Sequence, residues 1–208
     1  MSERVLKVLN LYAGIGGNRK LWTDVQVTAV EIMPAIAGIY RDMFPYDKVI
    51  VDDAHNYLLE HFEEYDLIWS SPPCPSHSHI RKELGVGSGQ NKPIYPDMKL
   101  YEEILLLKHY FKGRYVVENV VSFYEPLIKP YELASHYFWS NFYIKIIEGN
   151  SREHHSDVDD LEERKGFDLS KYSGIDKRKA LRNCVEPEVG LHILNYARKD
   201  IDISKPFL

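Results

Sequence analysis

Cys74 is the residue whose surroundings in the sequence most favour nucleophilic chemistry. Pro72 and Pro73 stand directly before it, and consecutive prolines fix the backbone and remove two amide donors, so the turn is stiff and aims the thiol in one direction. The apolar run from Tyr65 to Trp69 has the length and residue types of a buried parallel strand. Cys74 therefore comes just past the carboxyl end of a strand, where open α/β sheets bind ligands. The alternative is an ordinary small apolar residue.

A glycine-rich turn follows the first apolar run of the chain, which extends from Val5 to Leu11. The turn consists of Tyr12, Ala13, Gly14, Ile15, Gly16 and Gly17. Glycines permit positive φ and let a ligand approach the backbone, and the amides at the start of a following helix can face a carboxylate or a phosphate. The spacing differs from G-x-G-x-x-G, so a dinucleotide is not the first choice. The pattern indicates a nucleotide-type site, and a plain tight turn is the alternative.

Acidic residues end the next two predicted strands. Glu31 ends the strand over Val25–Val30, where a carboxylate can accept both hydroxyls of a ribose. Asp53 follows the strand over Lys48–Val51, and its carboxylate is placed to accept the exocyclic amine of an adenine or to cap the helix that follows. The two roles of Asp53 are compatible. These residues favour an adenosine-containing ligand.

Glu118 and Asn119 form a further polar pair at a predicted strand end, after Tyr115–Val117. If this strand is the neighbour of the strand before Cys74, the pair lies beside the thiol. Apolar residues at helical spacing predict helices over 34–44 and 97–111. The glycine-rich polar stretch from Arg81 to Pro93 is predicted to be a loop that acts as a lid.

Length and composition indicate one ordinary globular domain. The chain has 208 residues, of which 44% are hydrophobic and 27% charged, and it has no apolar stretch of membrane-spanning length and no recognisable leader. Two cysteines far apart in sequence favour a reducing cytoplasm over a disulfide scaffold, and no metal site is expected. The net charge of -5 argues against non-specific coating of nucleic acid, although it leaves room for a locally basic cleft.

Taken together, these motifs resemble in type and order those of the cytosine-5 methyltransferases, the S-adenosylmethionine-dependent DNA modification enzymes. The residues that match run from Asn10 to Gly17, then Glu31, Asp53, Pro73 and Cys74, and the triplet Glu118, Asn119 and Val120. Near the C-terminus, the run from Arg182 to Pro187 resembles the last motif of the family, with Arg182 where a glycine is usual, and a predicted helix from Val189 to Ala197 follows.

The resemblance implies a Rossmann-like α/β fold, a mostly parallel sheet with helices on both faces. It also implies a single catalytic methyltransferase domain over 1–208, with a reduced variable or target-recognition segment at about 121–180. In the family, the glycine turn holds the methionine moiety of S-adenosylmethionine, Tyr12 the adenine, Glu31 the ribose and Asp53 the adenine amine. The residues that match cofactor-binding positions are Tyr12, Ala13, Gly14, Gly16, Gly17, Glu31, Ile32, Asp53, Ala54, Pro73, Asn183 and Val185.

The resemblance assigns catalysis to Cys74, Glu118 and Asn119. A thiolate suits addition at C6 of cytosine because it attacks a soft carbon and leaves again, provided that its surroundings lower the pKa of Cys74. Protonated Glu118 would donate to N3 of the base, and Asn119 would orient the Pro-Cys loop. The target cytosine must be flipped out of a duplex to react.

Three departures from the family pattern stand out. Pro75 replaces the usual glutamine, and the arginine-containing Gln-x-Arg-x-Arg segment is missing, so that His136, Arg152 or Arg81 are the candidates to replace it. The chain between Val120 and Asn183 is too short for a whole target-recognition domain. Its remnant, from Glu148 to Asp176, is acidic and is predicted to be a solvated loop, with a metal site as the weaker alternative.

The candidates for nucleic-acid contact are polar and basic residues near the Cys74 turn and in the C-terminal third, although a solvated face would show the same pattern. They are Ser76, His77, Arg81, Lys82, Lys177 and Arg178. The predicted substrate is duplex DNA with a flipped cytosine. RNA cytosine, or a silent subunit that binds cofactor or nucleic acid, are the alternatives. A specificity partner or a homodimer would supply missing recognition, and a phage-borne or restriction-modification enzyme in a bacterial cytoplasm would have this compact form.

Overall fold

The computed structural model describes residues 5–79, 82, 86–147 and 157–199. Within these residues one sheet runs through the molecule, in the order β3-β2-β1-β4-β5-β7-β6. Its strands are β1 (Leu6–Leu11), β2 (Val25–Val30), β3 (Lys48–Ile50), β4 (Leu67–Ser70), β5 (Arg114–Val120), β6 (Tyr131–Leu133) and β7 (His136–Ser140). The first five strands are parallel, and β7 is antiparallel to both of its neighbours. The apolar runs of the sequence thus become the buried central strands.

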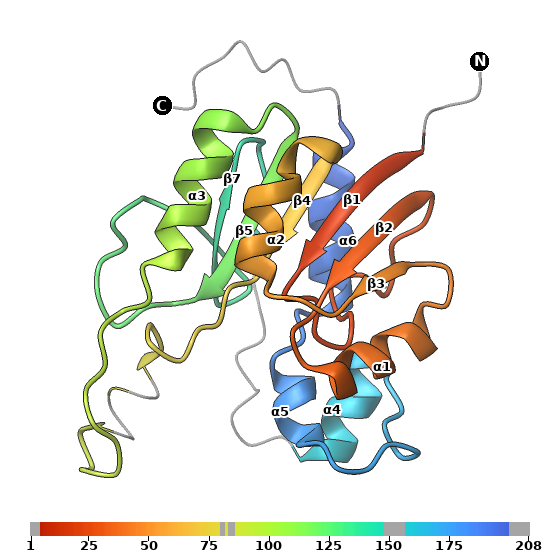
Figure 1. The fold of residues 1–208 in the computed structure, drawn as a ribbon. Helices are drawn as coiled ribbons and strands as arrows, with labels where there is room; N and C mark the ends of the chain where they lie inside the picture. Colours follow the sequence, from red (N-terminus) through yellow and green to blue (C-terminus); the bar gives the residue numbers. More distant parts are fainter. Residues whose placement is uncertain (1–4, 80–81, 83–85, 148–156, 200–208) are drawn as a thin grey trace.

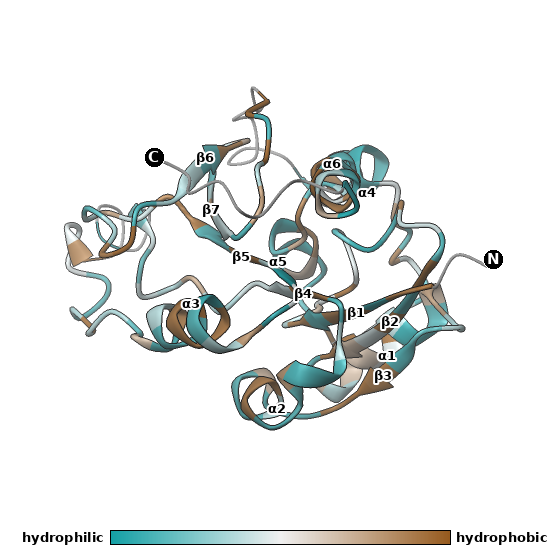
Figure 2. Ribbon diagram, turned by 90° about the horizontal axis from the view of Figure 1, so that it is seen from above, coloured by the Kyte–Doolittle hydropathy of each residue, from teal (hydrophilic) through white to brown (hydrophobic). Residues whose placement is uncertain are grey.

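Helices cover both faces of the sheet, which confirms the predicted fold class (Figure 2). The helices are α1 (Pro34–Met43), α2 (Ala54–His61), α3 (Lys99–Tyr110), α4 (Val158–Lys165), α5 (Lys177–Arg182) and α6 (Pro187–Ala197), with a short 3-10 helix, η1 (Phe62–Glu64), after α2. Successive strand residues face opposite sides. Leu9 therefore packs in the cluster that includes α2 and α3, whereas Val8 packs in the cluster that includes α6.

The connection from β1 to β2 differs from the prediction. A helix was expected after the glycine turn, but residues 12–24 form a series of turns. The face of the sheet that such a helix would cover is covered instead by α6, from the other end of the chain (Figure 1). Gly190 of α6 lies so close to the connection that a Cβ there would come 2.2 Å from the carbonyl oxygen of Asn18. The absence of a side chain at Gly190 therefore allows α6 to take this position.

The predicted acidic loop is wrong in part. Residues 148–156 lie outside the described residues, but Asp157 accepts a hydrogen bond from the amide of Asp160 and begins α4. Acidic residues in the first turn suit the positive end of a helix. Leu161 of α4 is fully buried in a small core with Leu181 of α5 and Ile15 of the glycine turn. A helix with so few buried apolar residues leaves little periodicity in the sequence, which is why it was missed.

No helix among the described residues is long and apolar enough to cross a membrane.

Candidate active site

The carboxyl ends of β1, β4 and β5 lie side by side at one edge of the sheet (Figure 1). Leu11, the last residue of β1, pairs with Ser70 of β4, and Ser70 pairs with Val117 of β5. The glycine turn, the Cys74 loop and the Glu118-Asn119 pair therefore meet at this edge, as the strand-end argument predicts.

Asn119 fastens the Cys74 loop to the sheet. The side chain of Asn119 is 2% exposed, and its Nδ2 donates a hydrogen bond of 3.0 Å to the carbonyl oxygen of Pro72. The carbonyl oxygen of Cys74 accepts bonds from the amides of His77 and Ser78, so the thiol stands at the start of a tight turn. This geometry matches the orienting role that the resemblance suggests for Asn119.

The Cys74 thiol is half-buried, and its surroundings raise its pKa rather than lower it. Burial, followed by the negative charge of Glu118, raises the pKa of Cys74 to about 11, and the guanidinium of Arg182 opposes this only weakly. The condition set in the sequence analysis, a lowered pKa at Cys74, is therefore not met, because desolvation outweighs the nearby cation. The same interactions show that the charges of Glu118 and Arg182 both lie close enough to act on this thiol.

Glu118 lies inside β5 rather than beyond its end, because the strand continues to Val120. The residue is 8% exposed, and its Oε1 lies 3.8 Å from Nε2 of His136 on β7. A nearly buried carboxyl group with one histidine neighbour is a group that can take up and release a proton at the site.

Glu31 closes the glycine turn from the second strand. Its two carboxylate oxygens accept hydrogen bonds from the amides of Gly14, at 3.0 Å, and Met33, at 2.9 Å. Each oxygen keeps a second lone pair for an incoming hydroxyl. Gly14 has φ of +55°, and nothing lies within 4 Å of where its Cβ would stand. Ile32, beside Glu31, is 60% exposed.

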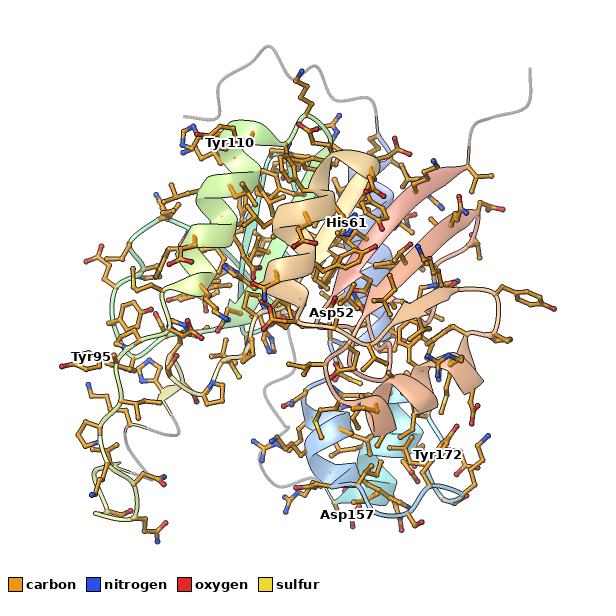
Figure 3. The ribbon with its side chains drawn as sticks, in the orientation of Figure 1. Asp52, His61, Tyr95, Tyr110, Asp157 and Tyr172 are labelled. Atoms are coloured by element: carbon orange, nitrogen blue, oxygen red, sulfur yellow. The ribbon has the colours of Figure 1, made fainter. Side chains whose placement is uncertain are left out.

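Asp53 caps α2, as predicted, by accepting a bond of 3.0 Å from the amide of Asn56. Ala54 is buried behind it, and Lys99 of α3 lies 4.0 Å from the second carboxylate oxygen of Asp53. Asp52, labelled in Figure 3, precedes this cap at the carboxyl ends of the strands. Open space above Gly14, free lone pairs on Glu31 and an acidic residue at Asp53 fit an adenosine-containing methyl donor.

Glu103 is a site residue that the sequence reasoning missed. Its carboxylate is fully buried and accepts bonds from the hydroxyls of Tyr12, at 2.6 Å, and Ser70, at 2.5 Å, while Nδ1 of His55 lies 3.0 Å away. The pKa of Tyr12 is raised by burial and by this charge, and the hydrogen bond to Glu103 raises the pKa of His55. Glu103 thus joins the glycine turn, β4 and α2. The signal was available, because Glu103 stands on the apolar stripe of a helix between Leu100 and Leu107.

The C-terminal segment packs directly on the glycine turn. A Cβ on Gly17 would come 2.4 Å from the carbonyl oxygen of Val185. The buried Nζ of Lys165 donates a bond of 2.5 Å to the carbonyl oxygen of Cys184 and lies 3.4 Å from the carboxylate of Glu186. The helical unit of α4 and α5 therefore holds this segment beside the turn. Asn183, one of the predicted cofactor residues, is exposed at the end of α5.

The sequence of the chain matches a known protein family. The model of the C-5 cytosine-specific DNA methylases matches residues 6–124, which is more than half of the chain and includes β1 to β5 and the Cys74 loop. The chain belongs to the C-5 cytosine-specific DNA methylase family. It is therefore a methyltransferase of a family that acts on C5 of cytosine.

One solved methyltransferase structure has the same fold, and two others align with part of this chain. The structure of the Entamoeba histolytica methyltransferase EhMeth is 12% identical, with a TM-score of 0.57 over 94% of this chain and 98% of that one. Spodoptera frugiperda DNMT2 is 26% identical over 55% of this chain and 35% of that one, with a TM-score of 0.38. A methyltransferase from Agrobacterium tumefaciens is 15% identical over 59% and 41%, with a TM-score of 0.41. A search of the curated proteins finds no match.

Within this methylase, the predicted nucleic-acid contacts divide into exposed and enclosed side chains. Lys82 and Arg178 are exposed, and Lys177 is half-buried. The ammonium of Lys82 lies 5.0 Å from the ring centre of Phe123. His77 is 1% exposed and its Nδ1 lies 2.6 Å from the hydroxyl of Tyr124, so its ring supports the Cys74 loop from inside. The remaining predictions are Ser76, whose hydroxyl accepts from the amide of Asp97 at 2.9 Å, and Arg81, which lies outside the described residues, as does Arg152.

Proposed function

We propose that this methylase transfers a methyl group to C5 of a cytosine flipped out of duplex DNA, through a covalent bond between Cys74 and C6. The observation that carries the proposal is the convergence of Cys74 and Glu118 at one strand edge, with Asn119 bonded to the carbonyl of Pro72. S-adenosylmethionine supplies the methyl group when it is bound. Glu31, Asp53 and the Gly14 turn would hold its ribose, adenine and amino-acid ends.

The raised pKa of Cys74 determines how the thiol must be activated. At neutral pH the thiol keeps its proton, since its pKa is about 11. As the base enters, the Glu118 carboxylate takes this proton, and the thiolate attacks C6. The electron pair of the C5–C6 double bond moves towards C5 and the ring, and Glu118 passes the proton to N3. The thiol proton thus ends on the base, and no further donor is needed for the addition.

The remaining steps return the site to its starting state. Once C5 has been methylated, the hydrogen at C5 leaves as a proton to a base, which can be water. The electron pair that this releases re-forms the C5–C6 double bond and expels Cys74 as a thiolate, while N3 gives its proton back to Glu118, which returns it to the sulfur. Asn119 keeps the sulfur on one side of the ring throughout, because its amide holds the carbonyl two residues before Cys74.

The experiment is a methylation assay with tritiated S-adenosylmethionine on unmethylated genomic DNA and, in parallel, on structured RNA. Wild type is compared with Cys74→Ala and Glu118→Gln, and with Glu63→Gln as an exposed control far from the strand edge. Label in 5-methylcytosine of DNA, lost in both site variants and kept in the control, is the expected result. Label in RNA alone would assign the same chemistry to RNA. Labelling by Cys74→Ala as fast as wild type would refute the covalent route.

A bound adduct gives a second readout. Cytosine with fluorine at C5 cannot lose that substituent as a proton, so the enzyme should stay attached to DNA that contains it. We expect wild type, but not Cys74→Ala, to form a complex that survives denaturing electrophoresis. Binding of cofactor or DNA with no label transfer and no such complex would indicate the silent-subunit alternative.

A further inference from the structure

The histidine beside Glu118 has a place in the site that no family motif assigns. His136 is the first residue of β7 and pairs with Val120, while Glu118 pairs with Phe138 two residues further along β7. Residues two apart on a strand face the same side, so His136 and Glu118 are diagonal neighbours on one face of the sheet. Nε2 of His136 lies 3.8 Å from Oε1 of Glu118.

The tight turn before His136 fixes the orientation of its ring. Ala134 and Ser135 form a two-residue loop with φ of +49° and +63°, a conformation that two-residue hairpins require but that residues with side chains rarely adopt. Nδ1 of His136 lies 3.1 Å from the carbonyl oxygen of Ala134. A strained turn beside a catalytic group is a common sign of a functional constraint.

The hydrogen bond to Ala134 also fixes which nitrogen carries the proton. A carbonyl oxygen can only accept, so Nδ1 of His136 must be the donor. Nε2 then has a lone pair in the neutral ring or a second proton in the imidazolium. Both forms of the ring have a matching form of Glu118. The lone pair of the neutral ring can accept from the protonated carboxyl group, and the N–H of the imidazolium can donate to the carboxylate. The separation of 3.8 Å is that of an electrostatic contact rather than a hydrogen bond, so the ring acts on the position of Oε1.

We infer that His136 is a positioning residue for Glu118: its Nε2, 3.8 Å from Oε1, orients the carboxyl group so that Oε2 is presented to Cys74 and to N3 of the base. This inference rests on the proposed function. It also accounts for the missing Gln-x-Arg-x-Arg segment, since His136 would supply a polar contact at Glu118 from a different element. The other charges at this thiol are Arg182, at the end of α5, and Glu118 itself.

Two matched variants separate this role from a purely structural one. In His136→Asn, the side-chain amide reaches the position of Nδ1 and can keep the bond to Ala134, but it cannot reach Glu118. In His136→Gln, the amide reaches the position of Nε2 and can contact Glu118, but it lacks the titrating ring. We expect His136→Asn to lower kcat at least about tenfold with KM for S-adenosylmethionine within about twofold, and His136→Gln to recover part of that loss. If the role is only to anchor the turn, Asn is the variant that recovers.

A measurement that needs no activity completes the test. The nitrogen chemical shifts of His136 in the 208-residue chain should show a hydrogen on Nδ1. A ring protonated only on Nε2 would overturn the inference whatever the enzyme does. If wild type labels no nucleic acid but the Nδ1–H form is found, the proposed function fails and the pairing stands. If wild type is active and His136→Asn is equally active, the inference alone fails.

Discussion

The reactivity of Cys74 provides a sharp quantitative check on the electrostatics of the site. An alkylating reagent attacks the thiolate, and the Cys74 pKa is raised from 9.0 to about 11. Each pKa unit changes the thiolate fraction tenfold well below the pKa, so at pH 8 native Cys74 should react about 100-fold more slowly than the same cysteine in the unfolded chain. Its alkylation rate should rise steadily with pH until about pH 11.

Two substitutions should move this rate in opposite directions. Glu118→Gln removes the second-largest cause of the raised pKa, so Cys74 should react faster at pH 8, by roughly threefold to tenfold. Arg182→Gln removes a weak opposing charge and should slow the reaction by about twofold. The faster thiol of Glu118→Gln should nevertheless belong to an inactive enzyme, because that variant cannot pass a proton to the base.

The assay is iodoacetamide labelling of the native protein, quantified at each cysteine by peptide mass spectrometry. Cys184 is an internal reference, because burial raises its pKa to about 11 as well and it is only 8% exposed. Glu63→Gln, an exposed substitution, should leave the rate at Cys74 unchanged. If native Cys74 reacts like an unfolded thiol, or if Glu118→Gln slows it, the account of this thiol is wrong.

Five further substitutions test other parts of the site. Gly17→Ala should lower the free energy of unfolding in urea by about 1–3 kcal/mol, since its Cβ would come 2.4 Å from a backbone oxygen of the C-terminal segment. Gly14→Ala should lower this free energy by less despite the positive φ of Gly14, because no atom lies within 4 Å of its Cβ position. Asp53→Asn should keep the helix cap and the melting temperature but weaken S-adenosylmethionine binding about tenfold in calorimetry, and unchanged binding would exclude the adenine role. Glu103→Gln should destabilise the protein by about 1–3 kcal/mol in the same urea titration, because a buried acceptor of several bonds loses its charge, and a neutral result would show that the cluster around it is dispensable. Tyr95 is 96% exposed and projects from the loop that is bonded to the Cys74 segment (Figure 3). Tyr95→Ala should weaken DNA binding several-fold in fluorescence anisotropy without affecting cofactor binding.

The central strands and the residues at their carboxyl ends could be predicted from the sequence. The first strand is buried on both sides from Val8 to Leu11, and Pro72 or Gly14 marks where the chain leaves the sheet. Parallel order then brings Glu31, Cys74 and Glu118 to one edge without further information. The part of the site that depends on strand ends was therefore predictable.

Features that depend on contacts between distant segments were not predictable in this way. The pKa of Cys74 depends on how deeply the loop is packed, which residue spacing does not encode. Glu103 stands out in the sequence as a charge on the apolar stripe of a helix, but the sequence does not show that Tyr12 and Ser70 are its partners. The placement of His136 beside Glu118 needs the antiparallel register of β7, which residue spacing does not give.

The position of α6 has a consequence for how the protein is made. Because α6 covers the strands at the beginning of the chain, the apolar side of β1 and β4 stays open until residues 187–197 leave the ribosome. Contacts of such long sequence separation form slowly, since the intervening chain must close into one large loop first. The glycine turn should therefore acquire its final shape only after α6 has been synthesised.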